Sequence, residues 1–438
     1  MLKTSKTISL LVGLLFLFVI IGCSNDDVVQ RDNGAEGSGN AGEEQVEISF
    51  WHIYSDGPMK EVMTELVNEF ENQHPSITVT ELGTNFFDYF TKLNTAMAGG
   101  TAPDLALNDT STLPVRAESG SILSIDSFIE NDNFNVDDFF PVLIDKMEYE
   151  GSMYGLPSDT DVRVLFYNKD HFSEVGLDPE SPPTNWDELE EYAEKLTEWD
   201  SNGLLKRMGF SPTVGNFHFH TLAWTNGGEF WDDEGNPTFM KQENIEALQW
   251  MENMKEMYGD AAISAFNSEA NALEYSPFID EKVSMVVDVN NLYQDIKRYN
   301  PELNFGVAPI PYQTEPVTWS AGFDYEITNN HDESKAEAAW ELLKYLTSAE
   351  TQIRIHEEWG SLVSNENAAK ASQFMENPIW ALIVEQMDHA RFIEYIPALP
   401  AWHSTTGAAE EAVMNADVDP VEALEDAQEV AKRAVESH

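Results

Sequence analysis

Beyond its N-terminal tail, the chain opens with apolar positions that follow strand and helix periods in turn. The runs "VEISFWHI" (46–53), "ITVTEL" (77–82) and "DLALN" (104–108) are short and rich in β-branched or aromatic residues, and therefore predict strands. Between them, 58–75 and 86–100 carry apolar residues at helical spacing, and proline or glycine ends each run. This β-α-β-α-β order predicts an α/β lobe with a doubly wound sheet.

The same patterns continue along the chain. Further strands are expected within 278–288 and 304–311. Amphipathic helices are predicted for 182–196, 333–346, 379–395 and 419–436. The chain therefore mixes strands and helices in its first and middle parts and ends in helices. Some 390 residues beyond the tail are too many for a single small domain, so two lobes are expected.

The N-terminus has the pattern of an export signal. Lys3 and Lys6 precede an apolar run, 8–22, that is too short for a convincing membrane-spanning helix. The single cysteine of the chain, Cys23, follows this run directly and can form neither an internal disulfide nor a zinc site alone. The residues "IIGC" resemble the lipobox of bacterial lipoproteins, in which the cysteine carries the lipid. The alternative is a signal peptide beside an incidental cysteine.

Residues 23–45 are polar and rich in Gly, Ser, Asn and acidic residues, which predicts a flexible tether between the lipid and the fold. Residues 1–22 are then the signal peptide.

The charge of the chain is strongly negative, with 24 Lys and Arg against 78 Asp and Glu and a net charge of −54. Nucleic acid and anionic lipid headgroups are poor partners for such a surface. Many of the acids fall on the predicted solvent faces of helices, which favours adaptation to a salty or alkaline exterior. A requirement for a cationic ligand is the alternative interpretation.

Ligands of open α/β sheets bind beyond the carboxyl ends of the strands. This rule nominates Trp51 and His52 after the first strand, and Asn108 and Asp109 after the third. Each pair also has a structural interpretation, since Trp51 could be a core residue and Asp109 could cap a turn.

Several motifs, in order along the chain, resemble the bacterial extracellular solute-binding proteins that serve maltose and multi-sugar importers. The segment "GLPSDTDVRVLFYNKDHF" followed by "PPTNWDELEEYAEKL" is similar to a characteristic stretch of that family. The other matching stretches are "AGGTAPDLAL", "TNGGEFWDDEGNP", "VSMVVDVNNLY", "WSAGFDYEI" and "IPALPAW…DPVEALEDAQEVAKRA". The resemblance extends from about Val46 to the end of the chain.

This resemblance implies a two-lobed periplasmic-binding-protein fold (type II-like) with crossover hinge strands and a helical C-terminal section. Lobe 1 would comprise 46–157 and about 320–370, and lobe 2 would comprise 158–319 and about 371–438. Crossovers are expected at 158–162 and near 319–324. The implied function is capture of a sugar between the lobes and delivery to the permease subunits of an ABC importer, by a lipid-anchored monomer on the extracellular face of the cytoplasmic membrane. No cofactor and no metal site are implied.

The resemblance also implies a set of ligand-contacting residues. They are Trp51, His52, Asn85, Asp109, Asp161, Asn291, Tyr293, Phe323, Asp324 and Trp402. Trp402 would stack on a sugar ring, with a core tryptophan as the alternative, and Asp161 could instead be an exposed acid of the crossover. Tyr293 is offset from the stacking position of the family. Phe323 and Asp324 replace the small residues that are usual after Gly322.

Other function classes have less support in the sequence. The chain lacks the G-x-S-x-G, H-E-x-x-H and P-loop motifs, and paired carboxylates indicate no glycosidase among so many acids. His218 and His220 predict a strand or helix start rather than a metal site, and "DSNG" and "DDEG" predict turns rather than calcium loops. A receptor for a polyamine or a metal ion stays open, because Asp109, Asp159, Asp161 and Asp324 could form an acidic cleft. A phosphorylated ligand is less favoured, since only Arg116 and Arg163 lie near these motifs, and so is a structural surface protein.

Overall fold

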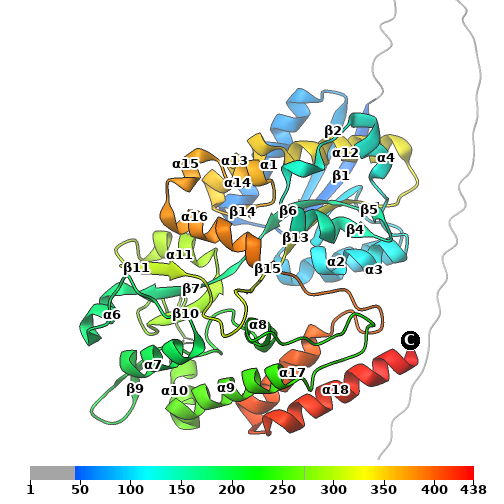
Figure 1. The fold of residues 1–438 in the computed structure, drawn as a ribbon. Coiled ribbons are helices and arrows are strands. Elements are labelled where there is room, and N and C mark those ends of the chain that lie inside the picture. Colours follow the sequence, from blue (N-terminus) through cyan, green and yellow to red (C-terminus); the bar gives the residue numbers. More distant parts are fainter. Residues whose placement is uncertain (1–44, 271) are drawn as a thin grey trace, which may run out of the picture. The chain divides into compact units, whose positions relative to one another are not determined.

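The computed structural model of the chain describes residues 45–270 and 272–438, and Figure 1 shows their arrangement. The signal peptide, Cys23 and the predicted tether up to residue 44 lie outside the described residues. The expected β-α-β-α-β beginning is confirmed. Its elements are β1 (Val46–His52), α1 (Gly57–Gln73), β2 (Ile77–Gly83), α2 (Phe86–Ala98) and β3 (Leu105–Asp109).

The larger sheet has six strands in the order β14-β6-β13-β3-β1-β2. The strands that join the first three are β6 (Leu156–Thr160), β13 (Gly322–Ile327) and β14 (Leu362–Val363). β1 is parallel to both β2 and β3, whereas β13 runs antiparallel between β3 and β6. The carboxyl ends of β1, β2 and β3 therefore meet at one edge of this sheet.

Helices cover both faces of the larger sheet. α1, α12 (Glu333–Thr347) and α13 (Ala349–Trp359) pack on one face, because α1 presents Met59, Val62, Leu66 and Phe70 along a single stripe. α2 lies on the opposite face, where Tyr89 donates hydrogen bonds to the carbonyl oxygens of Trp51 and Leu107.

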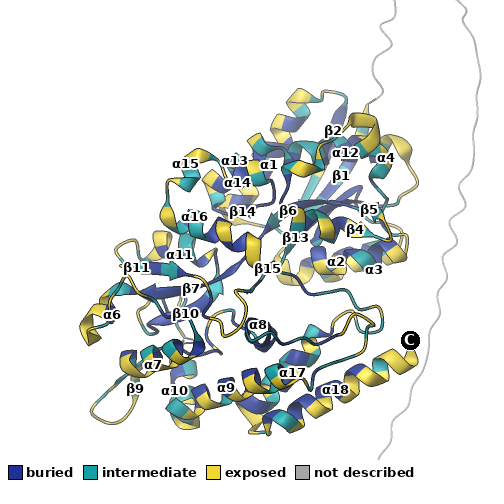
Figure 2. Ribbon diagram, viewed as in Figure 1, coloured by how far each residue is buried: buried dark blue, intermediate teal, exposed yellow. Residues whose placement is uncertain are grey.

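The smaller sheet consists of β10 (Met285–Val289), β7 (Arg163–Asn168) and β11 (Phe305–Ala308), with β7 antiparallel to both neighbours. All six residues of β7 are buried. Val164 and Phe166 face one hydrophobic core, and Leu165 and Tyr167 face another. Both faces of this sheet are therefore covered. Figure 2 shows β7 and β10 largely in the dark blue of buried residues.

The second of these cores is largely helical. It packs α8 (Phe219–Thr225), α9 (Gln242–Tyr258), α17 (His403–Ala416) and α18 (Pro420–Ser437) on one another. The helical C-terminal section is thus confirmed, as is the start of a helix at His218, which precedes the first residue of α8.

The chain passes between the two sheets at the expected crossovers. Only Asp161 and Val162 separate β6 from β7. On the way back, β12 (Thr318–Trp319) pairs in parallel with β15 (Ala390–Arg391) and leads into β13. The Ser320 hydroxyl donates a 2.6 Å hydrogen bond to the Asp161 carbonyl oxygen, which fastens one crossover to the other. The lobe bounds given above remain a prediction.

The remaining elements are short or peripheral. They are α3 (Leu113–Glu118), α4 (Asp126–Asp132), α5 (Pro141–Ile144), β4 (Glu148–Tyr149), β5 (Ser152–Met153), α6 (Lys169–Val175), α7 (Trp186–Leu196), β8 (Glu198–Trp199), β9 (Leu205–Arg207), α10 (Asp260–Ala270), α11 (Leu292–Tyr299), α14 (Glu366–Ala369), α15 (Ser372–Met375) and α16 (Pro378–Glu385). "DSNG" and "DDEG" form turns, in which Asp200 and Asp232 accept backbone N–H groups of their own loops.

One predicted helix is too long. The helical pattern at 379–395 ends as α16 at Glu385, and a 3-10 turn (Gln386–His389) and β15 follow. Residues 390–391 are needed as the partner of β12, so tertiary pairing overrides the local helical pattern there.

Candidate ligand-binding site

A cavity of about 120 Å³ lies where the edge of the larger sheet meets the crossover segments. Residues 109–111, at the end of β3, and residues 319–322, which lead into β13, form part of its wall. Lys146, Phe392, Ile393 and His403 complete the wall. The cavity thus lies beyond the carboxyl end of a strand, where the rule for open α/β sheets places a ligand.

Asp109 reaches the cavity because it is the last residue of β3. Its Oδ1 accepts a 2.8 Å hydrogen bond from the backbone N–H of Ser111 and a second hydrogen bond from the Ser111 hydroxyl. The carboxylate therefore caps the 3-10 turn Thr110–Thr112, as the structural interpretation of this residue expected. Asp109 also forms part of the cavity wall, so it can cap the turn and still contact a ligand.

A buried ion pair behind Asp109 fixes the position of its backbone. Arg116 donates from Nε to both carboxylate oxygens of Glu326, at 2.9 and 2.7 Å. From Nη2 it donates to the Asp109 carbonyl oxygen at 2.9 Å. Asn108 adds a 3.0 Å hydrogen bond from Nδ2 to Glu326. Both charges of the pair are thus satisfied where they are removed from water, as a buried pair requires.

The first crossover brings together a carboxylate, a guanidinium and an indole ring. Asp161 accepts a hydrogen bond from the Arg163 guanidinium. The guanidinium carbon lies 3.7 Å from the centre of the Trp319 ring, which is the geometry of a cation–π contact. Trp319 is a wall residue of the cavity. Arg163 therefore connects the predicted acid of the first crossover to an aromatic ring of the second.

Asp161 is not itself a wall residue, but it holds two of them. Its Oδ1 accepts a 2.9 Å hydrogen bond from the backbone N–H of Ala321, and its carbonyl oxygen accepts from Ser320. Burial raises the pKa of the Asp161 carboxyl, although Arg163 and the Ala321 N–H favour the charged form. A quarter of the side chain is exposed, so the alternative of an exposed crossover acid applies only in part.

Asp159 lies in β6, two residues before Asp161, and the pKa of its carboxyl is strongly raised. Its Oδ1 accepts a 3.2 Å hydrogen bond from the backbone N–H of Phe323. Burial, reinforced by the charge of Asp161, raises the pKa of Asp159 to about 7 despite that hydrogen bond. Near neutral pH the protonated and the ionised form of this carboxyl are therefore both populated.

Phe323 and Asp324 are consecutive residues of β13 that differ in their exposure. Phe323 is half-buried and is the cross-strand partner of both Asp109 and Asp159. Asp324 is completely buried, and neither of its carboxylate oxygens has a hydrogen-bond partner in the described part of the chain. Burial and the neighbouring Glu326 raise the pKa of Asp324 well above its ordinary value, although Arg116 opposes them. The structure brings Phe323, but not Asp324, to the surface beside the cavity.

Three other predicted residues lie at the carboxyl edge of the sheet, and their side chains contact other residues of the chain. His52 is completely buried, accepts the Tyr54 backbone N–H at Nδ1, and has its Nε2 3.0 Å from Glu81. Trp51 packs against α2 and has the ammonium of Lys92 5.0 Å above its ring. Asn85 is exposed and caps α2 through the backbone N–H of Asp88. None of the three is a wall residue of the cavity.

Asn291 and Tyr293 are not brought to the cavity. They lie at the start of α11, and the Tyr293 hydroxyl accepts a 2.8 Å hydrogen bond from Asn377. Tyr293 lines a different depression, of about 300 Å³, with Lys297 and Trp380 among its neighbours. Their role as ligand contacts remains a prediction from the resemblance.

Trp402 is completely buried in this structure. Its ring packs against Trp224, Phe230 and Phe239, and its Nε1 donates a 3.0 Å hydrogen bond to the Glu394 carbonyl oxygen. No face of the ring is free for a sugar, which favours the alternative of a core tryptophan. The indole that lies at the cavity is that of Trp319.

Several residues of the cavity wall are not among the ligand contacts predicted from the sequence. Lys146, Phe392 and His403 come from segments in which no local pattern indicates a binding role, since only the fold brings them to β3. Trp319 could have been found, because it stands inside the predicted second crossover. Burial lowers the pKa of His403, although the charge of Asp109 opposes this. His403 is therefore a neutral hydrogen-bonding group near neutral pH.

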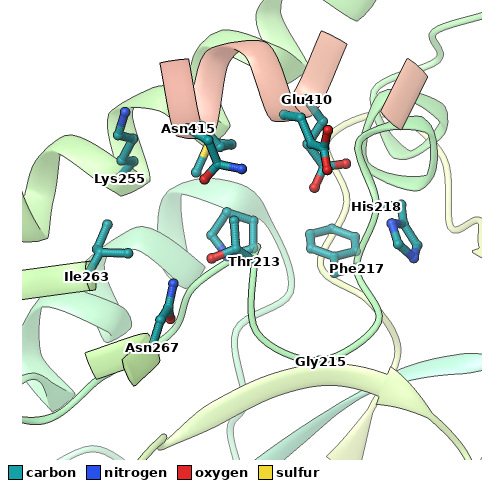
Figure 3. Close-up of a pocket in the computed structure, with 12 residues that line it drawn as sticks. Thr213, Gly215, Phe217, His218, Lys255, Ile263, Asn267, Glu410 and Asn415 are labelled. Carbon is teal, nitrogen blue, oxygen red and sulfur yellow. The ribbon is translucent and has the colours of Figure 1, made fainter. Parts of the chain in front are cut away.

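A second pocket of about 280 Å³ lies between α17 and the loop that precedes α8 (Figure 3). Glu410 and Asn415 point into it from α17, opposite Thr213. Glu410 accepts a 2.9 Å hydrogen bond from the Phe219 backbone N–H, and burial raises its pKa to about 7. None of the residues predicted to contact a ligand lines this pocket, so the smaller cavity at Asp109 is the better candidate.

Within 45–270 and 272–438, no group of three or more His, Cys, Asp or Glu side chains could hold a metal ion. In the same residues, no helix combines the length and the apolar character that crossing a membrane requires.

Comparison with known proteins identifies the family. The model of the bacterial extracellular solute-binding proteins matches residues 56–353. This chain belongs to that family. A binding protein of Brucella abortus is 25% identical over 391 residues, which are 89% of this chain and 92% of that protein. The maltotriose-binding protein of Pyrococcus abyssi is 24% identical over 86% of this chain and 80% of its own length.

Solved structures of binding proteins share the fold. CpMnBP1, solved with mannotriose bound, is 28% identical, with a TM-score of 0.77 over 88% of this chain and 100% of that one. A solute-binding protein of Thermotoga lettingae, solved with α-D-tagatose bound, is 25% identical, with a TM-score of 0.75 over 89% of this chain and 100% of that one. The fold of this extracellular solute-binding protein is thus the two-lobed α/β fold expected from the sequence.

Proposed function

We propose that this protein binds a sugar or a short oligosaccharide in the cavity at Asp109 and delivers it to the permease subunits of an ABC importer. The observation that carries the proposal is the meeting of Asp109 and Trp319 in one cavity at the crossover of a solute-binding fold. The names of the relatives support it, since they include a maltotriose-binding and an arabinooligosaccharide-binding protein.

The chemistry of the cavity suits a neutral sugar. A carboxylate accepts hydrogen bonds from sugar hydroxyls, and such charge-assisted bonds contribute about 1.5–3 kcal/mol each. The apolar face of a pyranose ring can lie on an aromatic ring. Arg163 lies over one face of Trp319, and the rings of His218 and His220 also contact this indole, so the sugar would stack on the part of the ring that lines the cavity. Ser111, Ser320 and His403 supply further polar groups in the wall.

A cationic ligand has less support from the geometry than from the sequence. Of the acids that could have formed an acidic cleft, Asp161 is paired with Arg163, and burial raises the pKa of Asp159 and of Asp324, which disfavours their charged forms. Asp109 is then the main negative charge at the cavity, and Lys146 is a wall residue as well. This arrangement favours an uncharged ligand.

The family consists of binding proteins, and we propose binding without catalysis here. A glycosidase would need one protonated and one ionised carboxyl on either side of the scissile bond. Among the described residues, Asp109 contributes the one carboxyl group of the cavity wall. No cofactor is needed for the proposed role.

We further propose that a lipid on Cys23 holds the protein, as a monomer, on the extracellular face of the cytoplasmic membrane. The apolar run before Cys23 and the polar stretch after it support this anchor. Cys23→Ala should release the protein from salt-washed membranes and leave ligand binding unchanged, because the polar stretch separates the anchor from the fold. A variant that stays in the membrane fraction would rule out the lipid anchor.

Calorimetric titration in about 1 M NaCl tests the proposed function. The panel comprises glucose, mannose, maltotriose, mannotriose and arabinotriose, with spermidine and calcium as cationic probes. We expect at least one sugar to bind at about micromolar affinity, near −8 kcal/mol. Binding of spermidine or calcium with no sugar binding would contradict the proposal.

A further inference from the structure

Four phenylalanines form an exposed cluster beside the cavity, which we call the aromatic rim: Phe86, Phe87, Phe90 and Phe323. The first three stand in the first turns of α2, and the fourth is the second residue of β13. The side chain of Phe87 is 90% exposed and that of Phe86 is 48% exposed. Large apolar side chains are rarely left this exposed in adjacent positions unless they take part in binding.

The rings of the rim contact one another in a defined geometry. Phe90 and Phe323 are stacked, with ring centres 6.3 Å apart and planes 15° from parallel. Phe86 meets Phe323 edge-on at 6.3 Å and Phe87 edge-on at 5.6 Å. The cluster therefore runs from the half-buried Phe323 outward to the fully exposed Phe87.

The inner end of the rim adjoins the candidate site. Phe323 is the cross-strand partner of Asp109, and its neighbour Gly322 is a wall residue of the cavity. The backbone N–H of Phe323 is held by Asp159. The position of Phe323 is thus fixed by the same strands that position the cavity, and the rim continues the surface of the site toward solvent.

The cavity is small compared with the roughly 300–1,000 Å³ of typical ligand pockets. A ligand longer than one sugar ring has to extend beyond it. At the outer end of the rim, Asn85 and Asp88 provide polar groups at the start of α2. Aromatic faces beside amide and carboxylate groups are what a chain of sugar rings can use, because each ring has an apolar face and a fringe of hydroxyls.

Building on the proposed function, we propose that the aromatic rim binds the outer rings of an oligosaccharide whose first ring lies in the cavity. The rim then makes the protein selective for chains of two or three sugar units over single sugars. The same exposed rings could instead bind a protein partner or a second copy of this chain. In that case their removal would not change the affinity for a trisaccharide relative to a monosaccharide.

The test compares the wild-type protein with Phe86→Ala and Phe87→Ala, singly and together. Calorimetric titrations use the trisaccharide that binds best and its own monosaccharide. The exposed ring of Phe87 makes few packing contacts, so this variant should fold normally. We expect the double variant to bind the trisaccharide about tenfold more weakly, the loss of roughly one stacking contact, and the monosaccharide as before.

Trp199→Ala provides the matched control, since Trp199 is 43% exposed on the β8–β9 hairpin and is not a wall residue of the cavity. It should leave both affinities unchanged. Equal affinities of the double variant and the wild type for the trisaccharide would overturn the rim proposal while leaving sugar binding intact. An equal loss for both sugars would overturn it too. If the wild-type protein binds no sugar at all, the proposed function fails as well.

Discussion

The guanidinium carbon of Arg163 lies 3.7 Å from the centre of the Trp319 ring. The same guanidinium is hydrogen bonded to Asp161, so a charge of one crossover is stacked on the aromatic ring of the other. In proteins that close around a ligand by hinge motion, the segments that connect the two domains bend. The contact therefore holds an aromatic wall of the cavity in a fixed position relative to the chain segments that would bend.

The first prediction separates the two tryptophans. Trp319→Ala should weaken sugar binding by about 1–3 kcal/mol, the size of an aromatic stacking contact. Trp402→Ala should instead lower the free energy of unfolding by about 3–5 kcal/mol, because it removes a completely buried ring. Calorimetric titration measures the first effect and urea unfolding the second.

The contrast between these variants decides which tryptophan serves the ligand. At a temperature where it remains folded, the Trp402→Ala protein should bind the sugar as the wild type does. If Trp402→Ala loses affinity without losing stability, Trp402 moves to the ligand on binding and the role predicted from the resemblance is restored.

A second prediction concerns pH and Asp159. Burial raises the pKa of this carboxyl from 3.8 to about 7 in the folded chain. Between these values the folded state binds a proton that the unfolded state releases, so stability falls as pH rises, by at most about 1.4 kcal/mol per pH unit. Asp159→Asn removes this contribution.

Urea unfolding of the wild type and Asp159→Asn at about pH 4 and about pH 7 measures the effect. The variant should gain stability relative to the wild type at the higher pH, because it has no buried charge to form. A difference between the two proteins that is the same at both pH values would mean that Asp159 has an ordinary pKa.

A third prediction follows from the net charge of −54. Repulsion among the acids should destabilise the folded chain in dilute buffer, and at about 1 M salt a Debye length of about 3 Å should screen most of it. The midpoint of thermal unfolding should therefore rise with NaCl concentration. A midpoint that is flat or falls would remove the interpretation of the charge as adaptation to a salty exterior.

The local patterns of the sequence were sufficient for much of the fold. The elements from β1 to β3, the helix α12 and the helix α18 have periods that agree with their burial, so local preference and tertiary packing coincide. The pattern fails after Glu385, where residues 390–391 pair with β12 and the helical period yields to a strand contact. Local patterns carry no information about such a distant partner.

The site was less predictable than the fold. Asp109 was expected from its place after a strand, and it lines the cavity. His52 occupies an equivalent place at the end of β1, yet it is completely buried and its ring contacts Glu81 of the neighbouring strand β2. The carbonyl oxygen of Asp109 is held by Arg116, 7 positions along the chain, and Arg116 in turn depends on Glu326, 210 positions further. Such contacts appear only when the chain is folded.

The most direct test of where the ligand binds compares Asp109→Asn with Glu410→Gln. Each variant replaces one carboxyl by an amide of the same shape, the first at the proposed cavity and the second in the larger pocket of Figure 3. Both are titrated calorimetrically with the sugar that binds the wild type best. We predict that Asp109→Asn weakens binding about tenfold, the loss of a charge-assisted hydrogen bond, and that Glu410→Gln changes it less than about twofold. Unchanged binding by Asp109→Asn together with a large loss in Glu410→Gln would place the ligand in the other pocket and contradict the proposed site.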